Sequence, residues 1–320
     1  MHEKMLDVTS LGSLAVDYFA LVSEIPGPEE KIMAVKYEIH PGGVSGNVLT
    51  QTARLGLRSG WFGKIGNDGE GEILIKEFER EGVDASHAEV VEGKHSMFTW
   101  IQVDKHGDRS ITLFPNVLIE LTADDVEKKH ADYIASSRVL QAESCILPFA
   151  PMIRAMEIAR ENGVKVVFDL DVTPSYLVHE SKQATEEQLR RAIEISDVFI
   201  PCKAGAKELV GSDDIENHAK KLFDFGAGIV AVTLGEKGCI VMDKSNAFTI
   251  PGYGVDVLDT TGAGDAFHGG FIYGILNNLT LKEIGLFSNA CGAMCCTKVG
   301  ARAMGTLDEV VSFMKERENV

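Results

Sequence analysis

The sequence predicts an α/β fold built on one mostly parallel central sheet. Short runs rich in β-branched residues alternate with longer amphipathic segments, which is the pattern of strand–helix–strand units. Several of the short runs, such as VKVVFDL at 164–170, are apolar almost throughout, as expected of parallel strands that helices cover on both faces. No repeat, low-complexity tract or Pro/Gly-rich linker divides the 320 residues, so we expect a single domain over 1–320.

The short apolar runs predict the strands of the central sheet, and the amphipathic segments predict its helices. The expected strands are 8–12, 59–66, 138–142, 164–170, 197–202, 228–234 and 238–243. The expected helices are 47–55, 70–81, 150–162, 185–195, 215–225, 263–277, 281–296 and 307–317.

A second group of extended segments does not fit this alternation. Residues 97–103 and 109–115 are strand-like and are joined by the turn-rich DKHGD, which predicts an antiparallel hairpin. Together with 13–17 and 32–40, this hairpin is expected to form a small second sheet that covers a site. Such a lid would comprise residues from about 12–40 and 96–116. An ordinary edge hairpin is the alternative.

The composition excludes several classes of protein. Lysine and arginine total 31 against 48 acids, a net charge of −17, which argues against binding to a nucleic-acid backbone. No apolar stretch approaches the roughly 18 residues that span a bilayer, and MHEKMLDVTS is not a signal peptide. The six cysteines form no CxxC pair and no zinc-type cluster with histidine. We therefore expect a cytoplasmic enzyme without nucleic-acid or membrane partners.

The segment DVLDTTGAGDAFHGGF, from residue 256, carries the strongest chemical signal. The small residues Gly262, Ala263 and Gly264 permit a tight turn whose amides, at the start of a helix, form an anion site. A carboxylate at Asp265 would repel a phosphate that is only bound there. It is explained if Asp265 removes the proton of an acceptor hydroxyl during phosphoryl transfer. The alternative is that Thr261 and Asp265 merely cap the helix.

Other glycine-rich stretches are less specific. There is no GxxxxGK[ST] motif, and GNDGEG at 66–71 lacks the GxGxxG spacing of a dinucleotide site, so a dehydrogenase is the weaker hypothesis. In the stretch 40–56, Gly42 and Gly43 permit close approach to a ligand, and Asn47 offers both donors and an acceptor to a polyol. A turn followed by a helix cap explains that stretch equally well.

Two motifs together resemble the signatures of the ribokinase (PfkB-type) carbohydrate kinases. PGGVSGN with LGLRSGWFGKIGNDGEG is similar to the amino-terminal signature, and DTTGAGDAFHGGF is similar to the carboxy-terminal one. The resemblance covers nearly the whole chain. It implies a ribokinase-like Rossmann-type sandwich with a small β-sheet lid, and ATP-dependent phosphorylation of a hydroxyl with Mg²⁺. It also implies a homodimer formed through the lid.

The resemblance assigns roles to individual residues. Asp265 is similar to the catalytic base, and Gly262, Ala263 and Gly264 resemble the anion hole beside it. The positions similar to sugar-binding residues are Asp17, Gly42, Gly43, Asn47, Glu143 and Asp265. Those similar to nucleotide-binding residues are Thr233, Gly235, Gly238, Gly264 and Asn289. Asp259 and Thr261, with carbonyl groups near Cys295, Lys298 and Gly300, resemble a loop for a monovalent cation such as K⁺.

Two departures from the family pattern concern metal ions. The Asn-x-x-Glu motif that helps to organise magnesium is replaced by Cys202-Lys203-Ala204-Gly205, and Met304 stands where a serine is common in the cation loop. The loop around 202–211, with FDLDVTP and CCTKVGARAMG, resembles the ketohexokinase and sulfofructose-kinase branches. Glu143-Ser144 and Phe114 stand where a sulfosugar kinase would carry arginine and asparagine, which favours a neutral sugar.

The sequence thus predicts an ATP-dependent kinase that phosphorylates a hydroxyl, expected to be primary, of a ribose- or ketohexose-like carbohydrate. A nucleoside, phosphosugar or sulfosugar kinase of the same fold remains an alternative, and Phe98, Trp100 and Phe114 leave the nucleoside open. A non-catalytic sugar or nucleotide sensor is a further alternative, which the intact Asp265 and its glycine turn disfavour. The sequence does not identify the sugar or its hydroxyl.

Overall fold

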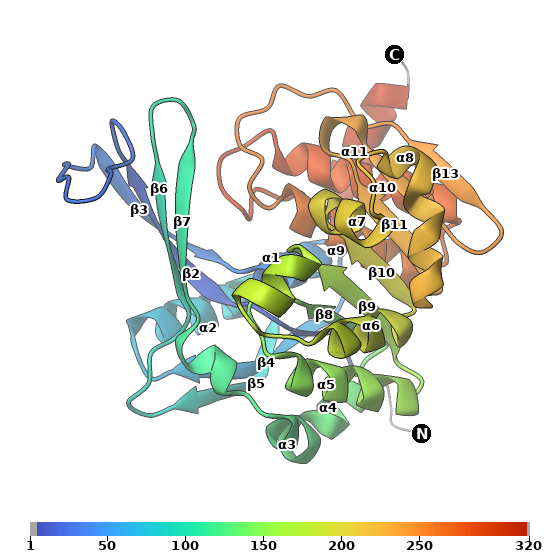
Figure 1. The fold of residues 1–320 in the computed structure, drawn as a ribbon, viewed down its shortest axis with the longest axis horizontal. Coiled ribbons are helices and arrows are strands. Elements are labelled where there is room, and N and C mark those ends of the chain that lie inside the picture. Colours follow the sequence, from blue (N-terminus) through green and yellow to red (C-terminus); the bar gives the residue numbers. More distant parts are fainter. Residues whose placement is uncertain (1–4, 319–320) are drawn as a thin grey trace.

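The chain consists of a large twisted sheet covered by helices and a smaller sheet that projects from one end of it (Figure 1). The structure is a computed structural model that describes residues 5–318. The large sheet has the strand order β13-β12-β11-β10-β9-β8-β1-β4-β5. Its strands from β11 to β5 are parallel, whereas β12 is antiparallel to both β11 and β13.

The strands of the large sheet have these bounds: β1 Val8–Leu11, β4 Ser59–Gly66, β5 Asp84–Val91, β8 Val139–Glu143, β9 Lys165–Leu170, β10 Val198–Pro201, β11 Ile229–Thr233, β12 Cys239–Met242 and β13 Ala247–Ile250. All seven predicted strands are confirmed. Strands β5 and β13 were not predicted, because both are edge strands whose residues are mostly half-buried or exposed and so lack a continuous apolar run.

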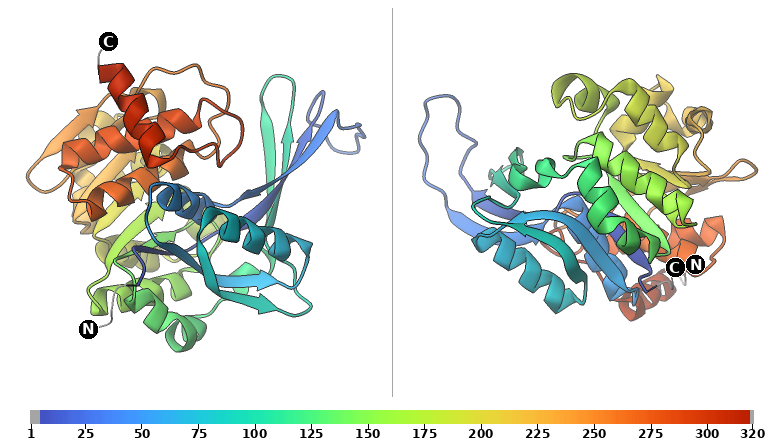
Figure 2. Two further views of the ribbon diagram at one scale, coloured as in Figure 1. Left: turned by 180° about the vertical axis from the view of Figure 1, so that it is seen from behind. Right: turned by 90° about the horizontal axis from the view of Figure 1, so that it is seen from below.

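Helices cover both faces of this sheet. The helices are α1 Val44–Arg54, α2 Gly69–Glu81, α3 Ala123–Asp125, α4 Ala131–Ala135, α5 Phe149–Glu161, α6 Glu186–Glu194, α7 Lys203–Val210, α8 Ile215–His218, α9 Ala263–Leu276, α10 Leu281–Cys295 and α11 Leu307–Glu318. Figure 1 shows α4, α5 and α6 in front of the sheet, and the view from behind in Figure 2 shows α1, α2 and α9 to α11 over the other face.

The predicted helices are present, with two differences. The helix expected at 47–55 begins three residues earlier, at Val44, because the left-handed backbone of Gly43 (φ 83°) starts it. The expectation of one helix at 215–225 was wrong, because α8 ends at His218 and a 3₁₀ segment continues to Phe225. Helix α7 and the short helices around residues 123–135 were not predicted.

The small sheet has the order β3-β2-β6-β7, with β2 Ala15–Leu21, β3 Lys36–Gly42, β6 Phe98–Val103 and β7 Arg109–Phe114. Strands β6 and β7 form the predicted antiparallel hairpin, and β2 pairs with β6 in parallel. Strand β2 follows β1 after three residues, so the two sheets are joined at Gly12–Leu14.

The core fixes the position of the loops at the carboxyl edge of the large sheet. Phe149, Phe168 and Phe199 are fully buried, and the rings of Phe168 and Phe199 stack at 5.8 Å. Strands β9, β8 and β1 are parallel neighbours, so the residues that follow them lie side by side at the carboxyl edge of the sheet. Open parallel sheets bind their ligands at this edge. Within residues 5–318, no helix is both long and apolar enough to cross a membrane.

Candidate active site

The junction between the two sheets is held by Ser13. Its amide donates a hydrogen bond to a carboxylate oxygen of Glu143 at the end of β8, whose other oxygen accepts from the amide of Cys145 at 2.6 Å. The Ser13 hydroxyl accepts from the amide of Val44 at 2.9 Å, and its carbonyl accepts from the amide of Gly46 at 3.2 Å. Ser13 thus ties β8 and the start of α1 to the first strand of the small sheet.

Glu143 is one of several carboxylates at this edge. Its side chain is fully buried, and this burial raises its pKa. Burial also raises the pKa values of Asp169, at the end of β9, and Asp171, just beyond it. The charges of Asp171 and Glu143 act on Asp265, so these carboxylates from β8, β9 and α9 share one region.

The turn before α9 has the geometry of an anion site. Gly262 has φ 79°, and a Cβ on it would lie 2.1 Å from the carbonyl oxygen of Ala301, so only glycine fits there. Among residues 5–318, no group accepts a hydrogen bond from the amide of Gly264 or of Asp265, and a Cβ on Gly264 would meet open space. These amides are free to bind an anion at the positive end of a 14-residue helix.

Asp265 is the acid of this turn, and it contacts the other glycine-rich motif. The side-chain nitrogen of Asn47 donates to Asp265 Oδ2 at 2.7 Å, so residues 218 apart in sequence meet. Burial raises the pKa of Asp265 to about 8, while the Asn47 bond opposes that shift and the charges of Asp171, Glu143 and Asp17 add to it. A carboxylate with a pKa near neutrality matches the requirement for a general base.

Asp17 lies on β2 of the small sheet, with its side chain directed toward the same region. Its residue is 8% exposed, and a Cβ on Gly42 would lie 2.0 Å from its Oδ2. Burial raises the pKa of Asp17 to about 6, against a hydrogen bond from Thr99 and the charges of Arg302 and His40. Gly42 is therefore glycine because the Asp17 carboxylate occupies the space of a side chain.

The predicted nucleotide-binding residues lie at the other end of the same edge. Thr233 ends β11, and Gly235 and Gly238 bound a short turn with φ of 64° and 93°. A Cβ on Gly238 would lie 2.0 Å from the carbonyl oxygen of Ile250. Asn289 on α10 donates to the carbonyls of Ile250 and Pro251 at 3.2 and 3.1 Å, so its amide nitrogen supports the end of β13.

The predicted cation loop is closed by its own hydrogen bonds. Asp259 Oδ1 accepts from the amide and the hydroxyl of Thr261 at 2.9 and 2.7 Å, and Oδ2 accepts from the amide of Gly300 at 3.0 Å. The Cys295 thiol donates to the Thr261 carbonyl at 3.5 Å. These bonds hold the pKa of Asp259 below its usual value in spite of its partial burial.

Cys202 stands where the family carries the asparagine of its magnesium motif. It is the N-cap of α7, and its sulfur accepts from the amide of Gly205 at 3.3 Å. The charges of Asp171 and Asp169 act on this thiol, so two carboxylates lie near it. Within the described part of the chain, no group of three or more His, Cys, Asp or Glu side chains is arranged to hold a metal ion alone.

Four residues of this region were not singled out from the sequence. Asp169 and Asp171 could have been found, because they follow a predicted parallel strand and the carboxyl ends of such strands meet. His268 on α9 lies 3.4 Å from Asp169 Oδ2, and burial lowers its pKa to about 3, so it is a neutral, packed residue. Arg302, which donates to Asn47 Oδ1 at 3.1 Å, lies in the CCTKVGARAMG stretch, which does not mark it as a contact of this site.

Arg109 connects the small sheet to this region. From the start of β7 it donates to the hydroxyl of Thr261 at 3.2 Å, which joins the small sheet to the turn before α9.

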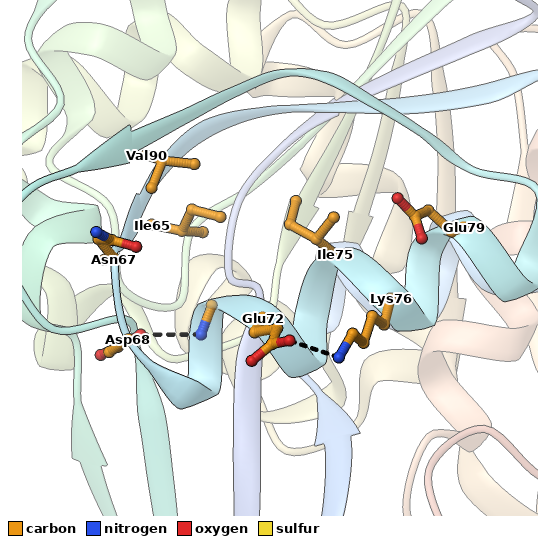
Figure 3. A pocket seen from close by; sticks show the side chains of 10 residues that line it. Ile65, Asn67, Asp68, Glu72, Ile75, Lys76, Glu79 and Val90 are labelled. Carbon is orange, nitrogen blue, oxygen red and sulfur yellow. Dashed lines mark hydrogen bonds and ion pairs between the residues drawn. The ribbon is translucent and has the colours of Figure 1, made fainter.

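A groove of about 490 Å³ lies elsewhere, between α2 and the β4–β5 edge (Figure 3). Asn67, Asp68 and Glu72 line it with Lys76, and Asp68 caps α2 by accepting from the amide of Gly71 at 2.9 Å. Part of the GNDGEG stretch lines it, and the acids of that stretch have structural partners: Asp68 caps α2, and Glu70 accepts a hydrogen bond from the hydroxyl of Tyr18. None of the residues assigned above lines this groove.

Comparison with known proteins places the chain in a family. The model of the pfkB family carbohydrate kinases matches residues 5–307. The chain is 30% identical to a ribokinase of Haemophilus influenzae over 315 residues, 96% of this chain and 98% of that protein. It is 31% identical to a fructokinase of Solanum tuberosum over 324 residues, 96% of this chain and 95% of that protein.

A solved structure agrees in fold. Arabidopsis thaliana ribokinase complexed with ribose and ATP superposes with a TM-score of 0.83, covering 98% of this chain and 99% of that chain at 20% identity. The family that the two motifs resembled is confirmed, as is its fold of a large, mostly parallel sheet with a smaller one. The chain belongs to the pfkB family of carbohydrate kinases.

Proposed function

We propose that this kinase transfers the γ-phosphoryl group of ATP to a hydroxyl, expected to be primary, of a neutral ribose- or ketohexose-like sugar. The observation that carries the proposal is the meeting of Asp265 with Asn47 at 2.7 Å, beside a turn whose amides are free to bind an anion. This arrangement places a base and an anion site at one point, as in-line phosphoryl transfer requires.

The proposed reaction uses the residues in these roles. Asp265 accepts the proton of the sugar hydroxyl as its oxygen forms a bond to the γ-phosphorus, and the bond from that phosphorus to the β-phosphate oxygen breaks to release ADP. The amides of Gly264 and Asp265 stabilise the charge on the transferred group. Asp17 and Asn47 orient the acceptor. Gly42 leaves room for the Asp17 carboxylate, Gly43 allows the close approach of Ser13, and Glu143 holds Ser13 in place behind them. The small sheet acts as a lid that excludes water, which would otherwise hydrolyse ATP.

ATP is expected along the edge where β11 ends. Thr233, Gly235 and Gly238 form the turn there, and Asn289 supports the neighbouring strand end. Magnesium would neutralise the phosphates, and it is commonly held by one or two carboxylates together with the nucleotide. Asp171 and Asp169 are the carboxylates that fit this role, since they lie near Cys202, where the usual motif is absent.

A neutral acceptor is favoured by the charge of the region. The charges of Asp171, Glu143 and Asp17 raise the pKa of Asp265, and that of Asp171 raises the pKa of Glu143, so a carboxylated, phosphorylated or sulfonated acceptor would be repelled.

A nucleoside acceptor is disfavoured by the aromatic residues of the lid. Side chains alternate between the faces of a strand. From the strand register, Phe98, Trp100 and Phe114 lie on the face opposite Asp17. Phe98 and Phe114 also stack on each other at 4.3 Å.

The test is release of ADP from ATP and Mg²⁺ with ribose, fructose, 2-keto-3-deoxygluconate, sulfofructose and nucleosides in parallel. Asp265→Asn should lower kcat about a thousandfold, because a positioned base contributes on the order of a hundredfold to ten-thousandfold. Asp213→Asn, at a carboxylate whose side chain is 97% exposed, is the matched control and should keep wild-type turnover.

Each outcome bears on the proposal. Turnover that requires ribose or fructose and is lost in Asp265→Asn would support it. Turnover with an anionic acceptor alone would overturn the neutral class, and ATP binding without any turnover would favour the sensor. Equal kcat for Asp265→Asn and the wild type would refute the role of the base.

We also propose a homodimer formed through the lid. On the face opposite Asp17, Tyr37, Ile39, Trp100 and Phe114 are between 38% and 51% exposed, which is a large apolar surface for a free lid. Sedimentation analysis should give a dimer for the wild type and a monomer for Trp100→Arg, and a monomeric wild type would refute the interface. The ATP requirement and six unpaired cysteines support a cytoplasmic location.

We do not expect activation by potassium. Both oxygens of Asp259 already accept hydrogen bonds within the loop, so a monovalent cation would have to displace Thr261 or Gly300 to bind them. We expect kcat to change less than about twofold when K⁺ replaces Na⁺ at equal ionic strength. A larger increase would assign the loop of Asp259, Thr261, Cys295, Lys298 and Gly300 to K⁺.

A further inference from the structure

Arg302 is a buried cation next to the proposed catalytic base, and the family motifs give it no role. It lies in the segment between α10 and α11, and its side chain is 7% exposed. Its Nε donates to Asn47 Oδ1 at 3.1 Å, and its Nη2 donates to the carbonyl of Gly42 at 3.3 Å. The guanidinium therefore contacts the residue that contacts Asp265.

The polarity of these contacts determines the orientation of Asn47. The two ends of an asparagine amide have nearly the same shape, so packing alone does not select which end faces a neighbour. Arginine has donors only and attracts the oxygen, which leaves the NH₂ group of Asn47 to face Asp265 at 2.7 Å. We propose that Arg302 is a positioning residue that keeps the NH₂ end of Asn47 on Asp265.

The surroundings of Arg302 are built to retain it. Glu77 Oε1 lies 3.6 Å from Nη1, and the ring of Phe78 lies 5.9 Å from Cζ. A Cβ on Gly46 would lie 2.6 Å from Nη2, so glycine is required for the guanidinium to approach α1. Burial lowers the pKa of Arg302 to about 10, so it stays charged at neutral pH.

The orientation matters because a donor stabilises the ionised form of a carboxylate, and a base must be ionised to accept a proton. A reversed amide would place its oxygen against Asp265 and favour the protonated acid. Asn47 is the donor that opposes the rise in the Asp265 pKa. The other titratable groups that act on Asp265 or are acted on by it are Asp17, Glu143, Asp169, Asp171 and Cys295.

The inference rests on the proposed role of Asp265, and the experiment separates the two. The variants are Arg302→Met, which has no donors, Arg302→Gln, which can present either end to Asn47, and Arg302→Lys, which only donates. Removal of the guanidinium leaves Glu77 paired with Arg80 at 2.5 Å. The matched control is Arg54→Met, because Arg54 donates to the carbonyls of Arg302 and Met304 but does not contact the Asn47 amide.

Two quantities are measured on each folded variant. One is the pH dependence of kcat with a saturating acceptor. The other, independent of turnover, is the titration of the Asp265 carboxyl by ¹³C NMR, assigned with Asp265→Asn. The titration of the Asp17 carboxyl reports the effect of losing the Arg302 charge by itself, because that charge acts on Asp17 directly.

In Arg302→Met the titration midpoint of Asp265 and the pH at which kcat falls on the acid side should both move up by about one pH unit. At the pH of the wild-type midpoint, kcat should then be about tenfold lower. Arg302→Gln should shift in the same direction, Arg302→Lys should restore most of the loss, and KM for ATP should stay within about twofold. Asp265 should shift more than Asp17. Arg54→Met should lower Tm with both midpoints unmoved.

The proposal fails if Arg302→Met and Arg302→Gln leave the Asp265 midpoint in place, or if Arg54→Met moves it equally. It also fails if Asp17 and Asp265 shift alike, because the lost charge alone would then account for the change. A wild type without acceptor-dependent turnover would count against the proposed function, and the Asp265 titration would still decide the role of Arg302.

Discussion

Two glycine turns precede two helices in this chain, and the structure uses them differently. The turn at Gly42–Gly43 starts α1, where Ser13 accepts hydrogen bonds from the amides of Val44 and Gly46. The turn at Gly262–Gly264 starts α9, where the amides of Gly264 and Asp265 have no acceptor among residues 5–318. Two similar local sequences thus give different helix starts. At α1 the protein supplies the acceptors for the first amides, and at α9 the first amides are open to a ligand.

The comparison shows why the glycines of the two turns are needed. At Gly43 and Gly262 the backbone is left-handed and the neighbouring backbone is too close for a side chain. At Gly264 the backbone is not left-handed and no neighbouring atom lies close, so the protein itself does not require glycine there. The missing side chain instead leaves space for a ligand at the free amides. The two classes of glycine should respond differently to the same substitution.

The largest effect is expected for Gly264→Ala. Its Cβ would enter the open space at the free amides, and we expect kcat/KM for ATP to fall about a hundredfold, as when a transition-state donor is lost. Alanine fits the helical backbone, so Tm should be unchanged or slightly higher. Steady-state kinetics and a thermal melt test this, and wild-type kinetics would remove Gly264 from the site.

Gly43→Ala should act on stability instead. Its Cβ would lie 2.6 Å from the carbonyl oxygen of Ser13, and φ is 83°, so we expect a loss of about 2 kcal/mol in the free energy of unfolding. Urea denaturation measures the loss. If Gly43→Ala were as stable as the wild type, the Ser13 backbone would not exclude a side chain at the start of α1, and the contrast with α9 would be wrong.

Ser13→Ala should cost about 1 kcal/mol of stability, since it removes the acceptor for the amide of Val44 and leaves the backbone bonds of Ser13 in place. The matched variant Ser13→Thr keeps a hydroxyl and separates loss of the bond from loss of packing. Urea denaturation of both variants distinguishes them. An equal loss in both would point to packing.

The smallest effect concerns the pH dependence of stability at Asp265. Its pKa in the folded chain, about 8, lies above the ordinary value of 3.8, so the folded form holds a proton that the unfolded form has released between these values. Stability should therefore fall as the pH rises through this window. Asp265 is only partly buried, so solvent reduces the size of the effect.

Asp265→Asn removes this titration and keeps an oxygen for Asn47. Its Tm relative to the wild type should rise from pH 5 toward pH 8 and stay level above that. A difference in Tm that does not change with pH would show that the carboxyl titrates at its ordinary pKa.

Much of the fold was predictable because its signals are local. Apolar runs located the seven inner strands, and the turn-rich DKHGD located the β6–β7 hairpin. The edge strands β5 and β13 were missed because partly solvated strands lack such runs. The two glycine turns differ because Ser13 accepts hydrogen bonds at the start of α1 and not at the start of α9. Ser13 lies about 30 residues before the first turn, and no local sequence pattern connects it with either turn.

The site was predictable where a motif is continuous and not where side chains meet across the fold. The contact of Asn47 with Asp265 joins two motifs that the sequence named separately. Arg302 and Arg109 reach the same region from segments whose patterns do not mark these side chains, because a long side chain can cover several ångströms from many positions. Such contacts are fixed by tertiary packing.

The anchoring of Ser13 has a consequence for how the small sheet can move. Ser13 is tied to β8 and α1, so it is a natural pivot for β2, in which Asp17 is four residues away and Leu21 eight. At about 3.3 Å per residue these lie about 13 and 26 Å from the pivot, and a rotation of about 10° displaces them by about 2 and 5 Å. The outer end of the strand can thus swing aside to admit a ligand while Asp17 travels about half as far.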